Sequence, residues 1–161
     1  MIWLIVIVVL LVCFAGVLLV GAPYLPTLGR QVDVALGLAD LQPGNTLLEL
    51  GCGDGKMLVA AAQQGIRVVG YELNPLLVIV AWLRTRRYRK QVRIIWGDFW
   101  RKPWSEADAI FVFLLPRYME KLHKKVIQYP HKPVKLISFA FEIPNKKPAT
   151  KKNGLFLYRY E

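Results

Sequence analysis

A glycine-rich segment, Glu49-Leu50-Gly51-Cys52-Gly53-Asp54-Gly55, constrains the fold of this 161-residue chain more than any other feature. The apolar run Thr46–Leu50 before it predicts a buried strand, and Lys56–Gln64 after it predicts a helix. Glycines between a strand and a helix allow a sharp turn and a close approach of the backbone to a ligand. Such a unit is typical of open parallel sheets, which bind cofactors at the ends of their strands.

The rest of the chain repeats this alternation of short apolar runs and helical patterns. A helix is expected from Thr27, a candidate N-cap, to about Leu41. Further strands are predicted at Arg67–Tyr71, Val92–Trp96, Ala109–Leu114, Val134–Phe141 and Leu155–Tyr160, and helices at Pro75–Tyr88 and Arg117–Gln128. The predicted fold class is therefore α/β, a doubly wound and mostly parallel sheet with helices on both faces. Asn145–Asn153, which contains four lysines, is expected to be a mobile basic loop.

Acidic residues follow the next two predicted strands. Glu72 closes the second strand, about 20 positions after the glycines, where a carboxylate can accept hydrogen bonds from both hydroxyls of a ribose. Asp98 follows the third strand and is expected to take the amino group of an adenine, while Phe99 or Trp100 packs on the ring. Taken alone, each acidic residue also fits a turn or a helix cap. Their joint spacing indicates a nucleoside-containing cofactor.

The surroundings of the glycines indicate which cofactor to expect. Dinucleotide sites use G-x-G-x-x-G, whose backbone N–H groups face a pyrophosphate, whereas this chain has G-x-G-x-G. Glu49 and Asp54 would repel a pyrophosphate but suit the ammonium and sulfonium groups of S-adenosylmethionine (SAM). Lys56 is followed by Met57 rather than by Ser or Thr, unlike the lysine of a Walker-type loop. SAM is therefore the predicted cofactor, and NAD and ATP are the alternatives.

The order of the motifs ELGCGDG, GYELNP and GDFW resembles that of class I, Rossmann-like SAM-dependent methyltransferases. More narrowly, Tyr24-Leu25-Pro26-Thr27 after an apolar segment, together with Val112-Phe113-Leu114-Leu115-Pro116, resembles the membrane-anchored protein-lysine methyltransferases. That subfamily includes the mitochondrial enzymes that act on the adenine nucleotide translocase and on the c subunit of ATP synthase. The resemblance runs from residue 1 to about residue 142. Beyond it the domain is C-terminally abbreviated, which leaves Leu155–Tyr160 as one closing strand.

The resemblance implies a cofactor pocket lined by these carboxylates and glycines and closed beside the membrane by Tyr24-Leu25-Pro26. The residues predicted to bind SAM are Tyr24, Glu49, Gly51, Cys52, Gly53, Asp54, Glu72, Leu73, Asp98 and Phe99. Leu115 and Pro116 are the candidates for the acceptor side. Their segment differs from the Asn/Asp-Pro-Pro-Tyr box that holds planar amides and exocyclic base amines. The same two residues equally fit a strand end and a helix start with no wider role.

The predicted reaction requires few chemical groups from the protein. SAM carries an activated methyl group, so neither a protein nucleophile nor a metal ion is required, and we name no catalytic residue. An acceptor lysine must be neutral, which an apolar pocket or the bilayer edge favours by lowering its pKa. His123 and His131 have no metal-ligand spacing and are expected to be solvated.

A charge-free segment opens the chain, since all 33 charged residues follow residue 29. Ile2–Val20 is rich in Ile, Val and Leu, and as a helix it would reach about 28 Å, close to the ~30 Å hydrocarbon core of a bilayer. We expect a transmembrane anchor at 1–22, a linker with the N-terminal helix at 23–45, and the methyltransferase domain at 46–161. A cleaved signal peptide and a buried core helix are the alternatives.

The distribution of positive charge predicts where the domain lies. All 22 Lys and Arg residues follow the apolar run, so the positive-inside rule places the C-terminal domain on the cytoplasmic side. The net charge of +11 includes a cluster between Arg84 and Lys90 and another between Lys121 and Lys125. We expect these clusters to face anionic lipid, with RNA as the alternative. The expected substrate is a lysine of a membrane protein. The alternatives are a lipid amine, a small molecule, RNA, or no catalysis by a module that only binds SAM.

Overall fold

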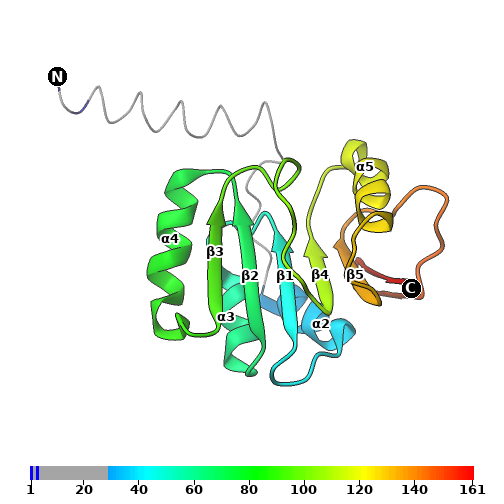
Figure 1. The fold of residues 1–161 in the computed structure, drawn as a ribbon, viewed down its shortest axis with the longest axis horizontal. Helices are drawn as coiled ribbons and strands as arrows, with labels where there is room; N and C mark the ends of the chain where they lie inside the picture. Colours follow the sequence, from blue (N-terminus) through cyan, green and yellow to red (C-terminus); the bar gives the residue numbers. More distant parts are fainter. Residues whose placement is uncertain (2, 4–28) are drawn as a thin grey trace.

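The structure is a computed structural model that describes residues 1, 3 and 29–161. A mixed sheet in the order β3-β2-β1-β4-β5-β7-β6 forms its centre (Figure 1). The strands are β1 (Thr46–Leu50), β2 (Arg67–Glu72), β3 (Val92–Trp96), β4 (Ala109–Val112), β5 (Val134–Phe139), β6 (Thr150–Lys152) and β7 (Leu155–Tyr160). The helices are α2 (Gly29–Ala39), α3 (Lys56–Gln63), α4 (Pro75–Thr85), the 3-10 turn η1 (Arg86–Tyr88) and α5 (Pro116–Ile127).

Strands β1 to β5 pair in parallel, and the strand order reverses at β1, which lies between β2 and β4. Parallel strands place all their carboxyl ends at one edge, and the crevice at such a reversal is where open α/β sheets bind ligands. This confirms the predicted Rossmann-like arrangement. It also places the loop after β1 at the centre of the carboxyl edge.

Helices cover both faces of the sheet. Helices α2, α3 and α4 lie on one face, and α5 lies on the other together with the irregular segment 97–108 (Figure 1). Successive side chains of a strand point to opposite faces. In β1, Leu47 accordingly joins the core beneath α2 and α3, whereas Leu48 joins the core beneath α5. The two-sided burial of the central strands β1 and β4 explains why both are mostly apolar in the sequence.

The C-terminal part of the sheet differs from the prediction. Asn145–Asn153 is not a loop throughout, because Thr150–Lys152 forms β6 and pairs with β7 in an antiparallel hairpin. The two-residue turn between them, Asn153-Gly154, has φ values of 51° and 78°. Asn-Gly favours this doubly left-handed turn. Leu155–Tyr160 is therefore not a lone closing strand, since β7 lies between β5 and β6. The alternation expected of a strand is missing from β6 because all three of its side chains are exposed.

Several boundaries shift by a few residues. The predicted helix Pro75–Tyr88 is α4 followed by the separate turn η1, and the predicted strand Ala109–Leu114 stops at Val112. Helix α5 begins one residue early, at Pro116, because proline suits the first turn of a helix. Apart from Met1 and Trp3, the predicted transmembrane anchor lies outside the described residues, as do Tyr24 and the candidate N-cap Thr27. Among the helices that the structure describes, none has the length and apolar content needed to cross a bilayer.

Candidate functional site

The carboxyl edge of the sheet brings together the acidic residues that the sequence placed after three separate strands. Glu49 lies in β1 beside Gly70 of β2, and Glu72 ends β2 beside Trp96 of β3. The backbone N–H of Gly97 donates to the carbonyl of Glu72 at 2.8 Å, which places the following Asp98 at the same edge. The strand order β3-β2-β1 thus aligns three carboxylates that are far apart in the sequence.

The glycine-rich loop leaves β1 in a series of left-handed turns. Gly51, Gly53 and Gly55 have φ values of 88°, 52° and 77°. The N–H groups of Gly51 and Cys52 both donate to the carbonyl of Tyr71 at 2.9 Å, which holds the loop against β2. A Cβ atom built on Gly51 would meet no atom of residues 29–161 within 4 Å. The backbone at Gly51 therefore faces open space, as expected where a ligand approaches the main chain.

Glu49 is a buried carboxylate without a complete set of partners. The residue is 6% exposed, and its Oε2 atom has no hydrogen-bond partner among the residues that the structure describes. Burial raises the pKa of this carboxyl group well above its usual range, and the nearby charges of Glu72 and Asp54 raise it further. A buried polar atom that lacks a partner is uncommon and costly, so it requires an explanation. A cationic ligand bound beside it would provide one.

Glu72 ties the loop after β1 to the start of α4. Its Oε2 atom accepts a hydrogen bond from the N–H of Gly53, and its Oε1 atom accepts one from the N–H of Asn74, both at 2.8 Å. Burial raises the pKa of Glu72, while these backbone N–H groups oppose the rise. Each carboxylate oxygen has a second lone pair. Glu72 can therefore hold the loop and still accept hydrogen bonds from a ligand.

Asn74 is a site residue that the sequence analysis missed. It is almost completely buried, and its Oδ1 atom caps α4 by accepting from the N–H of Leu76 at 2.9 Å. The N–H of Asn74 donates to the Glu72 carboxylate. Asn74 therefore both holds the Glu72 side chain in position and caps the first turn of α4. The signal was present, because Asn followed by Pro is typical of a helix N-terminus. Leu73, predicted to bind SAM, accepts a hydrogen bond at its carbonyl from Trp96 Nε1 at 3.1 Å.

Asp98 and Phe99 lie in a tight turn after β3. The Oδ1 atom of Asp98 accepts from the N–H of Trp100 at 2.8 Å, and its Oδ2 atom is 3.6 Å from Arg101 Nε. Phe99 packs against Trp100 with ring centroids 4.7 Å apart. The acidic side chain thus stabilises its own turn, in line with the alternative interpretation of an isolated Asp. The turn nonetheless presents an aromatic ring at the edge where the sequence predicts adenine.

Asp54 and Cys52 have structural contacts that the sequence did not indicate. Asp54 forms an ion pair with Arg84 of α4, and it also accepts a hydrogen bond from the N–H of Lys56. The Cys52 side chain is buried in the core on the α3 face. Burial raises the pKa of its thiol well above the usual range. The contribution of Cys52 to the loop surface is therefore made by its backbone.

The two acceptor-side candidates lie at the same edge, after β4. Leu115 is half-buried and precedes α5, whereas Pro116 is exposed and begins that helix. Phe113 packs against Phe139 at the ends of β4 and β5, with ring centroids 4.8 Å apart. Val112, the last residue of β4, pairs with Leu50 of β1. The apolar segment that follows β4 therefore begins beside the glycine-rich loop.

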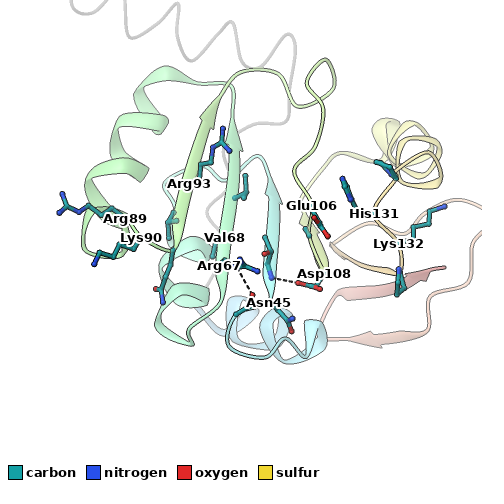
Figure 2. Close-up of a pocket in the computed structure, with 18 residues that line it drawn as sticks. Asn45, Arg67, Val68, Arg89, Lys90, Arg93, Glu106, Asp108, His131 and Lys132 are labelled. Atoms are coloured by element: carbon teal, nitrogen blue, oxygen red, sulfur yellow. Dashed lines mark hydrogen bonds between the residues drawn. The ribbon is translucent and has the colours of Figure 1, made fainter.

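A hollow lies at the opposite edge of the sheet, near the amino ends of the strands (Figure 2). It has a volume of about 900 Å³ and contains none of the residues predicted to bind SAM. Six of its lining residues are basic or imidazole side chains: Arg67, Arg89, Lys90, Arg93, His131 and Lys132. Glu106 and Asp108 also line it, and Asp108 accepts a hydrogen bond from the N–H of Thr46 at 2.7 Å. This hollow is separate from the carboxyl-edge site.

His123 differs from its predicted solvated state. Its Nδ1 atom lies 2.8 Å from the hydroxyl oxygen of Tyr160, within hydrogen-bond distance, and burial lowers the pKa of the imidazole. The contact joins α5 to β7, so His123 has a packing role. Within the described part of the chain, no group of three or more His, Cys, Asp or Glu side chains is arranged to hold a metal ion.

Comparison with known proteins gives consistent matches. The model of the ANTKMT methyltransferase domain family matches residues 49–150. The lysine N-methyltransferase of the ATP synthase c subunit from Xenopus laevis is 33% identical over 130 residues, which cover 78% of this chain and 56% of that protein. Adenine nucleotide translocase lysine N-methyltransferase of Mus musculus is 33% identical over 129 residues, with the same coverage. The chain thus spans little more than half the length of these relatives.

Among solved structures, an RNA methyltransferase from Salinibacter ruber in complex with S-adenosyl-L-homocysteine superimposes with a TM-score of 0.76. It is 30% identical, and the match covers 84% of this chain and 92% of that one. The matched family segment begins at Glu49 and includes Glu72, Asp98 and the start of α5. From the matched motifs and the shared fold, we conclude that this chain belongs to the ANTKMT methyltransferase domain family.

Proposed function

We propose that this chain is a membrane-anchored, SAM-dependent methyltransferase that N-methylates a lysine of a membrane protein. The observation that carries the proposal is the Oε2 atom of buried Glu49, which no described residue partners, two positions before Gly51, where the described residues leave open space beside the backbone. The chemistry of SAM fits this site, because its ammonium group would give Glu49 the missing partner. Binding of a cation there would also remove the cost of an ionised carboxylate in a buried position.

The other carboxylates suit the remaining parts of SAM. Glu72 lies beside the loop with lone pairs left to accept from ribose hydroxyls, and the Asp98–Phe99 turn is suited to an adenine. When bound, SAM supplies a methyl group on a sulfonium, which an amine can accept directly. The residues of this chain then have to bind SAM and the acceptor amine and orient them toward each other. Good alignment of reacting groups alone supplies up to roughly 7–11 kcal/mol of rate enhancement.

The acceptor must arrive as a neutral amine. A lysine of pKa ~10.4 costs about 4 kcal/mol to deprotonate near pH 7.4, at ~1.36 kcal/mol per pH unit. An apolar surrounding lowers that cost, because it disfavours the ammonium form. The wall formed by Phe113, Leu115, Pro116 and Phe139 at the carboxyl edge is suited to this role.

The membrane part of the proposal is supported by sequence and by the names of relatives. Residues 1–22 form the proposed anchor, 23–45 the linker with α2, and 46–161 the catalytic domain on the cytoplasmic side. Two relatives are named for methylating the c subunit of ATP synthase and the adenine nucleotide translocase. An anchor restricts the enzyme to acceptors near the bilayer, which raises their effective concentration.

Methyl-labelled SAM incubated with membranes and the full chain tests this function. We expect label in a protein band, recovered as methyl-lysine after hydrolysis. The Glu72→Ala variant should lose the label, whereas Glu142→Ala, a change at an exposed residue paired with Lys151, should retain it. Label confined to lipid or RNA would refute the lysine proposal. SAM binding without transfer to any fraction would identify a non-catalytic module.

RNA is the second candidate acceptor. The structural neighbour from Salinibacter ruber is described as an RNA methyltransferase, and the hollow in Figure 2 is rich in basic side chains. A polyanion would fit such a surface. Nuclease treatment of the labelled fractions separates this candidate from the first, because it removes label from RNA and leaves label in protein.

A further inference from the structure

Helix α4 is apolar on its outward side as well as on the side that packs against the sheet. Leu77 and Ala81 face inward and are buried. The outward positions are Ile79 (55% exposed), Val80 (40%), Trp82 (63%) and Leu83 (50%). A surface helix normally carries polar residues on its solvent side, and one that is apolar all round is normally covered. Large exposed apolar patches mark sites of contact with proteins or membranes.

Trp96 extends this surface to the carboxyl edge of the sheet. It ends β3 and is 62% exposed. Alternation along β3 places Trp96 on the same face as Val92 and Ile94, which pack in the core on the α3 and α4 side. Its Nε1 atom donates to the carbonyl of Leu73, just before α4 begins. We define the α4 patch as Ile79, Val80, Trp82, Leu83 and Trp96.

Positive charge lies at the other end of the α4 patch. Arg84 in the last turn of α4 pairs with Asp54, and the residues that follow the helix include Arg86, Arg87, Arg89 and Lys90. No Asp or Glu occurs between Glu72 and Asp98 in the sequence. Helix α4, the outer helix of this side of the sheet (Figure 1), therefore combines an apolar face that includes the exposed Trp82 with a basic end, and the exposed Trp96 of β3 lies near its start. Tryptophan favours the boundary between hydrocarbon and headgroups, and Lys and Arg favour anionic headgroups.

We propose that the α4 patch docks on an anionic bilayer, with its apolar side chains at the hydrocarbon boundary and its basic end among the headgroups. The inference rests on the membrane location in the proposed function, but not on methyl transfer or on SAM. The purely basic charge favours a lipid surface over a second copy of this chain, since two copies would bring like charges together.

Docking through the α4 patch would orient the site. Helix α4 begins directly after Asn74, whose N–H binds Glu72, and Trp96 lies at the same edge. A bilayer in contact with this helix therefore lies beside the carboxyl edge. A lysine of a membrane protein would then reach the site without leaving the interface, where reduced hydration lowers its pKa.

Lipid-borne quenching in the full chain tests the proposal. A fluorophore is attached to Ile79→Cys or Leu83→Cys in a Cys13→Ser background, since the remaining Cys52 is buried. The chain is reconstituted in phosphatidylcholine vesicles, with or without phosphatidylglycerol, that contain nitroxide-labelled phospholipid. We expect strong quenching of both labels in the anionic vesicles. Glu120→Cys on α5 is the matched control, exposed beside the second basic cluster, Lys121–Lys125, on the opposite face of the sheet. Docking through the α4 patch turns that cluster away from the bilayer, contrary to the expectation that both clusters face lipid, so this label should be quenched little.

Variants with fewer basic residues, together with aqueous iodide as a second quencher, distinguish contact with lipid from contact with protein. Changing Arg86→Gln and Arg87→Gln together should lower the ratio of docked to undocked chains by about tenfold or more, given the attraction of each basic residue to an anionic leaflet. A label shielded from aqueous iodide but not quenched by lipid nitroxide would overturn the proposal, because protein would then cover the patch. Equal quenching at Glu120→Cys would also overturn it.

Methyl transfer is measured on the same vesicles. Lipid quenching without any transfer would refute the proposed function and leave the docking surface intact. Transfer without lipid quenching would refute the docking surface alone. Circular dichroism of each variant checks its fold. We expect spectra that match the wild type, because the substituted side chains are exposed and changes at such positions usually alter stability little.

Discussion

At the residue scale, the burial of Glu49 makes the stability of the folded protein depend on pH. Its pKa in the folded protein lies well above the ordinary value of 4.5, mainly because of burial. The folded state therefore holds the proton more tightly than the unfolded state. This contribution to stability is complete below pH 4.5 and is lost as the pH rises through the folded-state pKa.

Glu49→Gln should remove this pH dependence, because the amide does not ionise. Between about pH 5 and 8, without SAM, the free energy of unfolding should fall less in the variant than in the wild type. Urea denaturation of both proteins at several pH values measures this free energy of unfolding. The variant should also bind SAM at least tenfold more weakly by calorimetry, since a neutral amide attracts an ammonium group less than a carboxylate does. Parallel stability curves for the two proteins would contradict the assignment.

Gly70 is required by close packing rather than by backbone conformation. A Cβ at this position would lie 2.8 Å from Cys52 Sγ and 3.0 Å from Leu58 Cδ1. Gly70→Ala should destabilise the fold by about 1–3 kcal/mol, the usual cost of overpacking. In a Cys52→Ala background the cost should be partly relieved, because Sγ is absent whereas the Cβ atom of residue 52, 2.9 Å from the built atom, remains. Chemical denaturation of the four proteins gives the coupling energy, and additive effects would contradict the contact.

The sequence identified the site carboxylates but not all of their partners. Glu49 and Glu72 were recognisable because they stand at strand ends with cofactor spacing. The pairing of Asp54 with Arg84 was not recognisable, since it depends on how closely α4 packs beside the loop. Thirty residues separate the two side chains, and no local pattern relates them.

At the element scale, the β6–β7 hairpin shows how a turn can decide where a strand forms. Gly154 has a φ of 78°, a conformation that L residues with side chains adopt at a cost. Gly154→Ala should therefore destabilise the hairpin by about 1–2 kcal/mol. Gly37 is the control, because it is exposed within α2 and the described residues leave its Cβ position free. Alanine at this position should raise the stability instead of lowering it. Gly37→Ala should stabilise by about 0.5–1 kcal/mol.

Thermal unfolding measures both glycine variants. The melting temperature should fall for Gly154→Ala and rise for Gly37→Ala, by roughly 2–4 °C per kcal/mol in a chain of this size. Equal shifts in the same direction would show that the turn conformation is not what distinguishes the two positions. The hairpin was missed in the sequence because the exposed lysines of β6 lack the alternation that marks a half-buried strand.

At the scale of the whole molecule, the proposed anchor and the α4 patch would act as two separate attachments. A protease site inserted between Ala22 and Pro23 of the reconstituted chain distinguishes them. After cleavage, residues 23–161 should leave zwitterionic vesicles but stay on anionic vesicles at low salt. Raising the salt to about 1 M should release them, because the Debye length shortens from about 10 Å to about 3 Å.

Sedimentation of the vesicles measures this release, and the uncleaved chain, which should stay bound throughout, is the control. Retention of the cleaved domain on zwitterionic vesicles at high salt would contradict the assignment of residues 1–22 as the anchor. Release from anionic vesicles at low salt would contradict attachment through the basic end of α4.

The sequence by itself determined the alternating strand and helix pattern, the glycine-rich loop and the acidic residues that follow three strands. These features are local: each depends on the spacing of apolar residues, on glycine conformation, or on a residue at the end of one strand. Only the tertiary structure decided which side chains remain without partners and which apolar residues remain uncovered. In the described part of the chain, Glu49 Oε2 lacks a partner and α4 has an exposed apolar face because of packing between distant segments, which local patterns do not encode.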